Sequence, residues 1–349
     1  MTRTCGDKAD AARQKARPRR SGPLRWSFNK SERHSMDIQY LLFLQQIRNS
    51  AGPLMTTLMV LVSDIAIYGS ITAALIIYWC VDRVQGYWIL ANCVSGFMVN
   101  NTLKLAACVY RPWIRDPRIV PPPAALKSAT GYSFPSGHTQ FAASFFGSVA
   151  IYNRKKYWQL IAPCIFCILL TGFSRNYLGV HTPQDVLVSF LIGALILKVS
   201  SVVFDRIQAD PALFPRLIPT GCVLVILCAL FFHFKSYPLH LMDGKPIVDP
   251  LEMVKDGYMA CGISLGFMIG ALIETRYIRF TADGSLFKRV IRFLCGLPVP
   301  ALLLLFVKKP LYALTGSTLG HLFLYFVLAL YFTAGYPAVF TAIKKRLPD

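Results

Sequence analysis

Three short polar blocks, each beside a long apolar run, contain residues able to bind and transfer a phosphate group. The first block, KLAACVYRP, contains Lys104 and, seven residues later, Arg111 followed by Pro112. On a helix this spacing puts both cations on one face, about 10 Å apart along the axis. Pro112 disfavours helical structure at Arg111, so the guanidinium is expected where the chain leaves the apolar segment. The alternative is that both are ordinary basic residues snorkelling at a helix end.

The second block, FPSGHTQ, brings Ser136, Gly137 and His138 to the start of an apolar run. The first amide groups of a helix have no partner within that helix, and they favour anions. A histidine beside them can hold or release a proton near neutral pH. The alternative is an N-cap serine with an incidental histidine.

The third block, SRNYLGVHTPQD, contains Arg175, His181 and Asp185. Thr182 is a suitable N-cap and Pro183 suits the first turn of a helix, so we expect a helix to begin here. Asp185 follows His181 by four residues, and its carboxylate can reach back to the imidazole. A carboxylate bonded to one ring nitrogen fixes the tautomer and makes the other nitrogen a better nucleophile. The alternative is a capping aspartate beside a surface histidine.

Together the three blocks supply three cations, two histidines, one carboxylate and a helix N-terminus. A dianionic phosphate needs clustered Lys or Arg side chains and free N–H groups. Its transfer needs a nucleophile and an acid that protonates the leaving oxygen. The sequence therefore predicts a phosphoryl-transfer site built from segments that lie far apart along the chain.

The elements that must position these blocks are membrane helices. Of the 349 residues, 54% are hydrophobic and 15% are charged, and the mean hydropathy is +0.47. Soluble domains average about a quarter charged residues. Apolar runs of about 20 residues can cross a bilayer, where a helix satisfies every backbone group within its own segment. We expect an all-α, polytopic membrane helix bundle with about nine transmembrane helices, at residues 54–80, 86–108, 137–153, 157–173, 185–205, 215–234, 257–274, 290–307 and 312–341.

The net charge of +20 does not indicate nucleic-acid binding. The basic residues lie in the N-terminal tail and in short loops that flank apolar runs, as membrane topology requires. Ten cysteines are scattered, mostly inside apolar runs. The one CxxC pair, Cys164 and Cys167, lies within a predicted span, which favours packing over zinc or redox chemistry. We expect no nucleic-acid partner and no metal site.

We expect three regions along the chain. Residues 1–35 contain ten Lys or Arg residues and no apolar segment, which predicts a basic disordered tail rather than a secretory signal. Residues 36–235 form a six-span core. It opens with an amphipathic helix at 36–50, too short to span and expected to lie on the membrane surface, with the apolar residues Ile38, Leu41, Leu42 and Leu44. Residues 236–349 form a three-span extension whose role stays open.

The order of the spans determines which loops share a membrane face. The loops at 109–136, 174–184 and 235–256 share the face that carries the three blocks. The opposite face holds short loops rich in Lys and Arg, such as residues 153–157. By the positive-inside rule that face is cytoplasmic, so the predicted site is on the non-cytoplasmic face. The basic tail contradicts this rule, and our hypothesis is that translation often starts at Met36 or that the tail is a misassigned extension.

In order and in spacing, the three blocks resemble the signature motifs of the type 2 phosphatidic acid phosphatase and vanadium haloperoxidase superfamily. The matching residues are Lys104, Arg111 and Pro112, then Pro135, Ser136, Gly137 and His138, then Ser174, Arg175, His181 and Asp185. The match covers residues 104–185 by motif and about 36–235 by helix arrangement. The nine-span count resembles the glucose-6-phosphatase branch, and sphingosine-phosphate phosphatases also extend a six-span core.

The resemblance implies a metal-independent phosphatase without a cofactor. His181 would attack phosphorus and form a phosphohistidine, with Asp185 orienting its ring. His138 would protonate the departing alkoxide and later activate water. The phosphoryl oxygens would be held by Lys104, Arg111, Ser136, Gly137 and Arg175.

The leading functional hypothesis is a phosphoric monoester hydrolase acting on a membrane lipid phosphate, with hydrolysis of an acid anhydride as a possible variant. Its substrate would be phosphatidic acid, a sphingoid-base phosphate or an isoprenoid pyrophosphate. The alternatives are a sugar-phosphate phosphatase, a phosphotransferase, and a catalytically silent transporter or scaffold, which the intact histidines disfavour. Asp64, in an apolar run, needs a partner and is expected to be structural. The headgroup, the membrane and the oligomeric state stay open.

Overall fold

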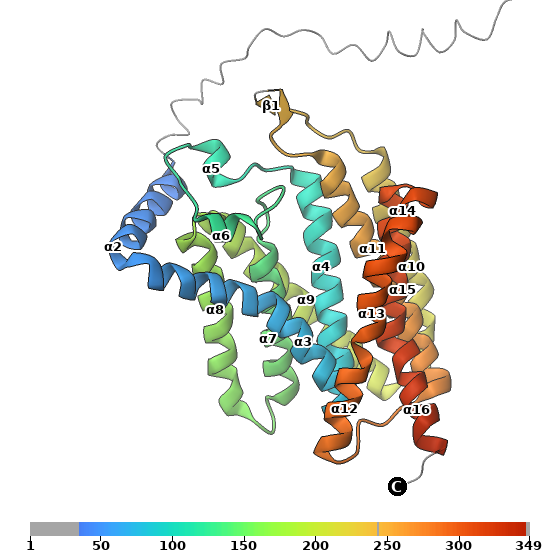
Figure 1. Ribbon diagram of the computed structural model, residues 1–349. Helices are drawn as coiled ribbons and strands as arrows, with labels where there is room; N and C mark the ends of the chain where they lie inside the picture. The colour runs from blue at the N-terminus through green and yellow to red at the C-terminus, as the bar shows by residue number, and fades with distance from the viewer. Residues whose placement is uncertain (1–34, 243, 347–349) are drawn as a thin grey trace, which may run out of the picture.

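The computed structural model of the protein describes residues 35–242 and 244–346, which are mostly helical (Figure 1). The α-helices are α2 Met36–Asp64, α3 Ser70–Ile76, α4 Arg83–Ala107, α5 Pro112–Arg115, α6 Pro123–Leu126, α7 Gly137–Asn153, α8 Ile161–Tyr177, α9 Pro183–Ala209, α10 Leu213–Phe234, α11 Pro250–Ile273, α12 Leu286–Gly296, α13 Pro298–Leu302, α14 Lys308–Thr315, α15 Ser317–Leu330 and α16 Tyr336–Arg346. Short π-helical segments join several of them: Ile65–Gly69, Ile77–Val81, Glu274–Ile278, Leu303–Val307 and Tyr331–Gly335. A 3₁₀ turn, Trp158–Leu160, precedes α8, and two short antiparallel strands, β1 Leu241–Met242 and β2 Lys245–Pro246, form a hairpin.

Seven helices of the described chain are long and apolar enough to cross a membrane. They are Met36–Val81, Trp158–Tyr177, Pro183–Ala209, Leu213–Phe234, Pro250–Ile278, Leu286–Thr315 and Ser317–Lys344. The other two predicted spans are the helices α4 and α7, which pack against each other. α7 has only 17 residues, and α4 carries the buried polar residues Asn92, Asn100 and Asn101. The all-α, multi-pass membrane bundle is confirmed, while the nine-span count stays a prediction.

The predicted surface helix is present, but its contacts differ from the expectation. α2 bends at Gly52, whose φ of 81° interrupts the helix, so residues 36–51 are set apart from the apolar segment that follows. Ile38 and Leu41 are buried against Ile119 of the loop after α5 and not on a free surface. A second apolar stripe remains exposed, formed by Met36, Tyr40, Phe43 and Ile47. An amphipathic pattern alone does not say whether its apolar face meets lipid or protein.

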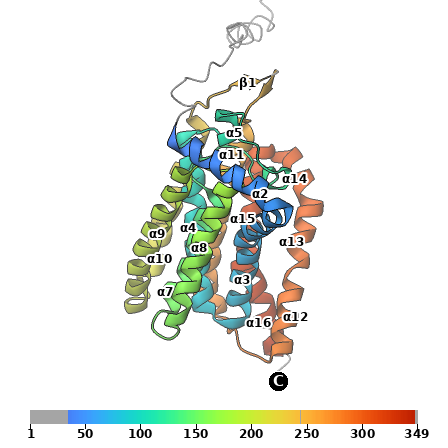
Figure 2. The same cartoon turned by 90° about the vertical axis from the view of Figure 1, so that its left-hand side faces the viewer.

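The loops that carry the predicted site gather at one end of the bundle. In two perpendicular views, α5, β1 and α14 lie at this end and α12 and α16 lie at the other (Figures 1 and 2). This agrees with the predicted sharing of one face by the loops at 109–136 and 235–256. Which face is cytoplasmic stays a prediction, as does the division into three regions, whose tail at 1–35 lies almost wholly outside the described residues.

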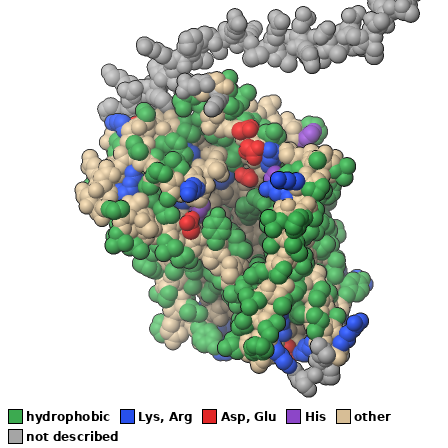
Figure 3. Space-filling model, in the orientation of Figure 1, with side chains coloured by type: hydrophobic (Ala, Val, Ile, Leu, Met, Phe, Trp, Pro, Cys, Tyr) green, Lys and Arg blue, Asp and Glu red, His purple; other side chains and the backbone are tan. Residues whose placement is uncertain are grey.

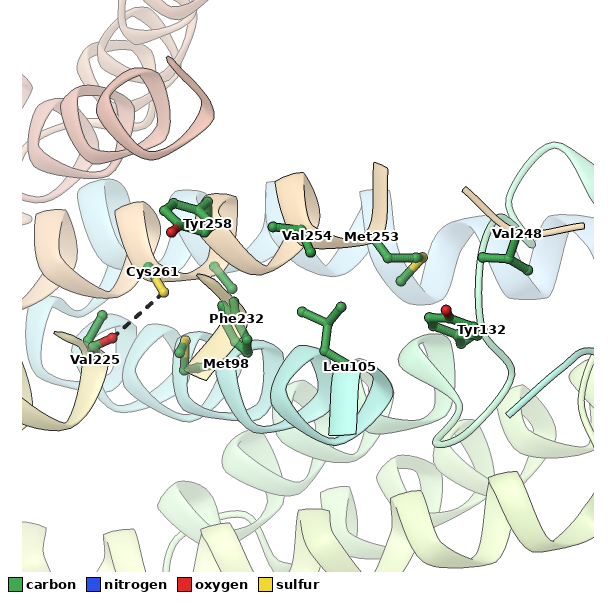
Figure 4. Close-up of a cluster of buried hydrophobic side chains, with 11 residues drawn as sticks. Met98, Leu105, Tyr132, Val225, Phe232, Val248, Met253, Val254, Tyr258 and Cys261 are labelled. Atoms are coloured by element: carbon green, nitrogen blue, oxygen red, sulfur yellow. Dashed lines mark hydrogen bonds between the residues drawn. The ribbon is translucent and has the colours of Figure 1, made fainter. Parts of the chain in front are cut away.

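The extension and the core share one hydrophobic cluster (Figure 4). Leu105 of α4 and Phe232 of α10 face Met253 and Tyr258 of α11 in this cluster, and Tyr132 closes it at the site end (Figure 4). All five side chains are buried. The first helix of the extension is therefore packed against the helix that ends at the predicted site.

Close helix packing holds the extension together. α11 and α15 are in extensive contact, and the sequence GISLGFMIG places glycines every four residues along α11. A Cβ atom at Gly262 would lie 2.2 Å from the carbonyl oxygen of Leu322, and one at Gly266 would lie 2.3 Å from that of Phe326. Small residues at this spacing let two helix backbones approach closely within a membrane.

Candidate active site

Arg111 and His181 meet at the centre of the site. Arg111 Nη1 lies 2.7 Å from His181 Nε2 and also donates to the carbonyl oxygen of Val180 at 2.9 Å. Its Nε and Nη2 donate to the carbonyl oxygens of Gly131 and Thr130, at 3.1 and 2.9 Å. His181 is only 1% exposed. The loop after α6 and the loop before α9 therefore hold the guanidinium in a fixed position against the buried imidazole.

Asp185 lies on the other side of the imidazole. Thr182 caps α9, and a reciprocal capping box forms in which the Thr182 amide donates to Asp185 Oδ2 at 2.8 Å. Ser133 Oγ donates to the same oxygen at 2.6 Å. His181 Nδ1 lies 3.4 Å from it. The capping box therefore anchors the carboxylate beside the ring. Asp185 both caps α9 and contacts His181, so both interpretations of this residue from the sequence apply.

These contacts assign the protonation state of His181. A guanidinium nitrogen can only donate, so His181 Nε2 is the acceptor and the proton of the neutral ring is on Nδ1, facing Asp185. Burial, together with the positive charges of Arg111, Lys104 and Arg175, lowers the pKa of His181 well below its ordinary value. Burial also lowers the pKa of Arg111 to about 10, which leaves it charged at neutral pH. The site therefore holds a neutral imidazole, with Nε2 as an acceptor, among cations.

Arg175 and Lys104 complete the cationic wall. Arg175 is completely buried, and its Nη1 lies 2.5 Å from Ser63 Oγ. Its Nε and Nη2 have no hydrogen-bond partner among the described residues. Asp64, which the sequence left in need of a partner, is an electrostatic neighbour of Arg175. Lys104 Nζ donates to the Tyr132 carbonyl oxygen at 3.0 Å.

The start of α7 faces the same site. Ser136 is the N-cap, and its side chain accepts from the Thr139 amide. The Ser136 amide donates to the Asp185 carbonyl oxygen at 3.1 Å, which ties α7 to the start of α9. His138, in the first turn, is buried, and its side chain makes no hydrogen bond within the part of the chain that the structure describes; its electrostatic neighbours are Arg175, His181, Arg111 and Lys104. An unbonded histidine beside these cations is free to exchange a proton with a ligand.

A cavity of about 430 Å³ opens beside Arg111, between the loop after α6 and the start of α11. Its apolar lining includes Trp113, Ile114, Ile247, Val248 and Met253. Three carboxylates of the extension also line it, Asp249, Glu252 and Asp256. Acidic and basic side chains gather near a hollow at this end of the molecule (Figure 3). The extension therefore forms one wall of the space next to the site.

The structure brings all eight predicted residues to one end of the bundle, from the end of α4, the N-cap of α5, the start of α7, the end of α8 and the start of α9. Sequence reasoning missed Ser63, Ser133 and Asn176. Asn176 Nδ2 donates to the His181 carbonyl oxygen at 2.9 Å, and the other two bond Arg175 and Asp185 as described. Of these three residues, only Ser133 and Asn176 could have been suggested by the sequence, because Ser133 directly precedes the second block and Asn176 lies within the third. Within the described residues, no group of three or more His, Cys, Asp and Glu side chains is placed to hold a metal ion.

Comparison with known proteins identifies two family regions. Residues 85–209 match the model of the PAP2 superfamily, and residues 258–346 match that of the PAP2 superfamily phosphatase transmembrane extension. No solved structure matches the chain significantly. Both regions contain helices described above, and the first contains every predicted site residue.

Curated relatives match part of the chain. The chain is 36% identical over 108 residues to phosphatidylglycerophosphatase B of Bacillus subtilis, covering 28% of this chain and 51% of the relative. It is 34% identical over 105 residues to undecaprenyl-diphosphatase BcrC of Bacillus subtilis (30% and 49%), and 33% identical over 132 residues to dolichyldiphosphatase of Saccharomyces cerevisiae (31% and 54%). The chain thus spans about half the length of the curated relatives it matches. With its site motifs and both family regions in place, the chain is a multi-pass membrane protein that belongs to the PAP2 superfamily.

Proposed function

We propose that the chain is an integral-membrane, metal-independent phosphatase that hydrolyses a lipid phosphate or diphosphate through a phosphohistidine intermediate. The observation that carries the proposal is the neutral His181 ring, whose Nε2 lies 2.7 Å from a fixed guanidinium in a buried cationic site. A neutral nitrogen nucleophile beside positive charges is what attack on a phosphate anion requires. The superfamily and the names of the relatives support the same reaction class.

In the first step, the substrate phosphate enters beside Arg111, and one of its oxygens replaces His181 Nε2 as the acceptor of the Arg111 Nη1 hydrogen bond. This frees the Nε2 lone pair, which forms a bond to phosphorus as the P–O bond to the leaving group breaks. His138 gives its proton to the leaving oxygen. The dianionic substrate favours the protonated form of His138 while it is bound. Asp185 stabilises the positive charge that develops on the His181 ring.

In the second step, water enters as the alcohol or phosphate leaving group departs. His138 removes a proton from this water, whose oxygen attacks phosphorus as the P–N bond to His181 breaks. Orthophosphate then leaves and the enzyme returns to its starting state. Lys104, Arg111 and Arg175 hold the phosphoryl oxygens throughout, with Ser136 and the Gly137 amide at the start of α7.

The cavity beside Arg111 supports a lipid substrate. Its apolar side chains suit a hydrocarbon part, and the relatives are named for phosphatidylglycerol phosphate and polyisoprenoid diphosphates. The carboxylates of Asp249, Glu252 and Asp256 can accept hydrogen bonds from polar groups next to the phosphate. We infer that the extension contributes to substrate recognition by forming this wall.

A phosphate-release panel tests the proposal. The purified chain is supplied with phosphatidic acid, phosphatidylglycerol phosphate, an isoprenoid diphosphate and glucose 6-phosphate in neutral detergent micelles. We expect turnover of at least one lipid substrate, unchanged by EDTA, and no turnover by His181→Ala. His233→Ala is the matched control, because this histidine is exposed on α10 and lies outside the site. Release from none of the four substrates, or full activity of His181→Ala, would refute the proposal.

We also propose that the site faces the non-cytoplasmic side, because the short loops at the opposite end are the more basic. Single cysteines at Val120 and Arg154, both exposed and at opposite ends of the bundle, test this orientation. A membrane-impermeant thiol reagent applied to intact cells should label Val120→Cys above the unmodified chain and leave Arg154→Cys at background. The reverse labelling pattern would overturn the orientation.

A further inference from the structure

A second cavity, of about 580 Å³, lies at the end of the molecule opposite the candidate active site. It is lined by the start of α4, by residues 279–283 and by α12, and three arginines contribute to its wall: Arg83, Arg279 and Arg289. Arg83 is the first residue of α4 and Lys104 is near its last turn, so roughly 30 Å of helix separates the two sites. This cavity is therefore no part of the phosphoryl-transfer site.

The acidic groups around the cavity are already engaged. Glu274, which is completely buried, pairs with Arg83 at 3.0 Å and so neutralises this arginine. Asp82 caps α4 through its side chain. Asp283 pairs with Lys344 at 2.9 Å. Apart from the Asp82 carboxylate, whose hydrogen-bond partners are uncharged, the lining residues without an ion pair within the described chain that carry a charge are Arg279 and Arg289.

These two guanidinium groups are positioned by their Nε atoms alone. Arg279 Nε donates to the Thr275 carbonyl oxygen at 3.2 Å, and Arg289 Nε donates to that of Gly284 at 2.9 Å. Their Nη groups have no hydrogen bond or ion pair within residues 35–242 and 244–346. Arg292, on the same helix as Arg289, instead uses both Nη groups on backbone carbonyl oxygens of the protein. Two oriented pairs of donors are thus available to an anion, and a guanidinium fork matches a phosphate in geometry.

The neighbouring surface indicates where that anion comes from. The outer face of α12 is apolar and exposed, with Leu286 at 79%, Phe287 at 72% and Leu294 at 57%. This face belongs to the helical segment Leu286–Thr315, one of the candidate spans. Exposed apolar side chains beside free cations are typical of the bilayer interface, where phospholipid phosphates lie.

We propose that this cavity binds the phosphate headgroup of an anionic phospholipid, with Arg279 and Arg289 as the ligand-binding residues and the exposed face of α12 against its acyl chains. The site is separate from catalysis and would couple the enzyme to the lipid composition of the leaflet at this end. It does not depend on the proposed phosphatase reaction, so either proposal can fail without the other.

Phosphatidylglycerol is a suitable probe, because it is a phosphodiester and not a substrate for a phosphomonoesterase. The full chain in neutral detergent is titrated with phosphatidylglycerol or phosphatidylcholine, and bound lipid is counted by native mass spectrometry. The double variant Arg279→Gln/Arg289→Gln should bind phosphatidylglycerol at least about 10-fold more weakly, because it loses two charge-assisted contacts. Its thermal unfolding midpoint in neutral micelles should equal that of the wild type, which verifies its fold.

The matched control is Arg154→Gln/Lys155→Gln, which removes two exposed basic residues from the same end of the molecule but outside the cavity. It should bind phosphatidylglycerol as the wild type does. Equal binding by the two double variants would overturn the proposal, as would equal affinity of the wild type for phosphatidylcholine. Displacement of the lipid by millimolar inorganic phosphate would show a free-anion site and would also overturn it.

Discussion

Replacing Arg175 with lysine tests the anion site most directly. The substitution keeps a buried positive charge but removes the Nε and Nη2 groups, which have no partner among the described residues. In the proposed function these groups donate to the phosphoryl oxygens. A hydrogen bond to a charged group contributes about 1.5–3 kcal/mol, so losing two costs about 3–6 kcal/mol. Since about 1.4 kcal/mol corresponds to a tenfold change, kcat/KM is expected to fall by about 10²–10⁴.

The assay is initial-rate phosphate release from a single lipid phosphate, with inhibition by inorganic phosphate measured in parallel. Thermal unfolding verifies that the variant is folded. Ser63→Ala is the matched control, because it removes only the hydroxyl at 2.5 Å from Arg175 Nη1 and leaves the free N–H groups in place. One hydrogen bond to a charged group contributes about 1.5–3 kcal/mol, so this control, which loses one such bond where Arg175→Lys loses two, should fall by only about 10–10². A folded Arg175→Lys enzyme with kcat/KM within roughly threefold of the wild type would refute the role of Arg175.

Three further predictions follow from the site. His181→Ala should abolish turnover. His138→Ala should slow hydrolysis of the intermediate, so that a ³²P-labelled substrate with a good leaving group yields acid-labile, labelled protein. Absence of label in every variant and in the wild type would argue against a covalent step. The lowered pKa of His181 favours its neutral form, so the nucleophile stays available as the pH falls through 6.5 and is lost only when the pH falls through the lowered pKa. The plot of kcat/KM against pH for the wild type should accordingly have its acid limb below pH 6.5. An acid limb above pH 6.5 would contradict the geometry. Gly131→Ala should reduce both stability and activity, because a Cβ there would lie 1.8 Å from Met253 Sδ and Gly131 has a φ of +66°. The free energy of unfolding should fall by about 1–3 kcal/mol, which thermal unfolding measures. A variant that melts at the wild-type temperature would rule out the tight contact.

Much of the site could be predicted because its chemistry is local in sequence. Asp185 reaches His181 through one turn of chain and a capping box, and both features follow from the order Thr182, Pro183, Asp185. The helix predicted at 137–153 has these bounds in the structure for the same reason, since Ser136 marks its start. Short-range rules of capping and proline placement were sufficient there.

What could not be predicted depends on packing between distant segments. The bond between Ser63 and Arg175 joins residues 112 positions apart, and nothing near Ser63 marks it. The contact of Ile38 and Leu41 with Ile119 could not be predicted, because lipid and protein accept the same apolar stripe. The carboxylates that line the cavity were missed for the same reason, since only the packing of α11 on α4 brings them to Arg111.

The hydrophobic cluster shared by α4 and α11 connects the last third of the chain to the residues next to Lys104. Leu105 follows Lys104 directly and packs where a Cβ atom at Gly257 would come within 2.7 Å of its Cδ1. A bulkier residue at Gly257 would have to displace the side chains of Leu105 and Phe232, and in the proposed function this would disturb the position of Lys104 next to the phosphate. In the proposed function, sequence changes in the extension can thus alter turnover without contacting the substrate. The packing of α11 on α4 makes the two family regions depend on each other.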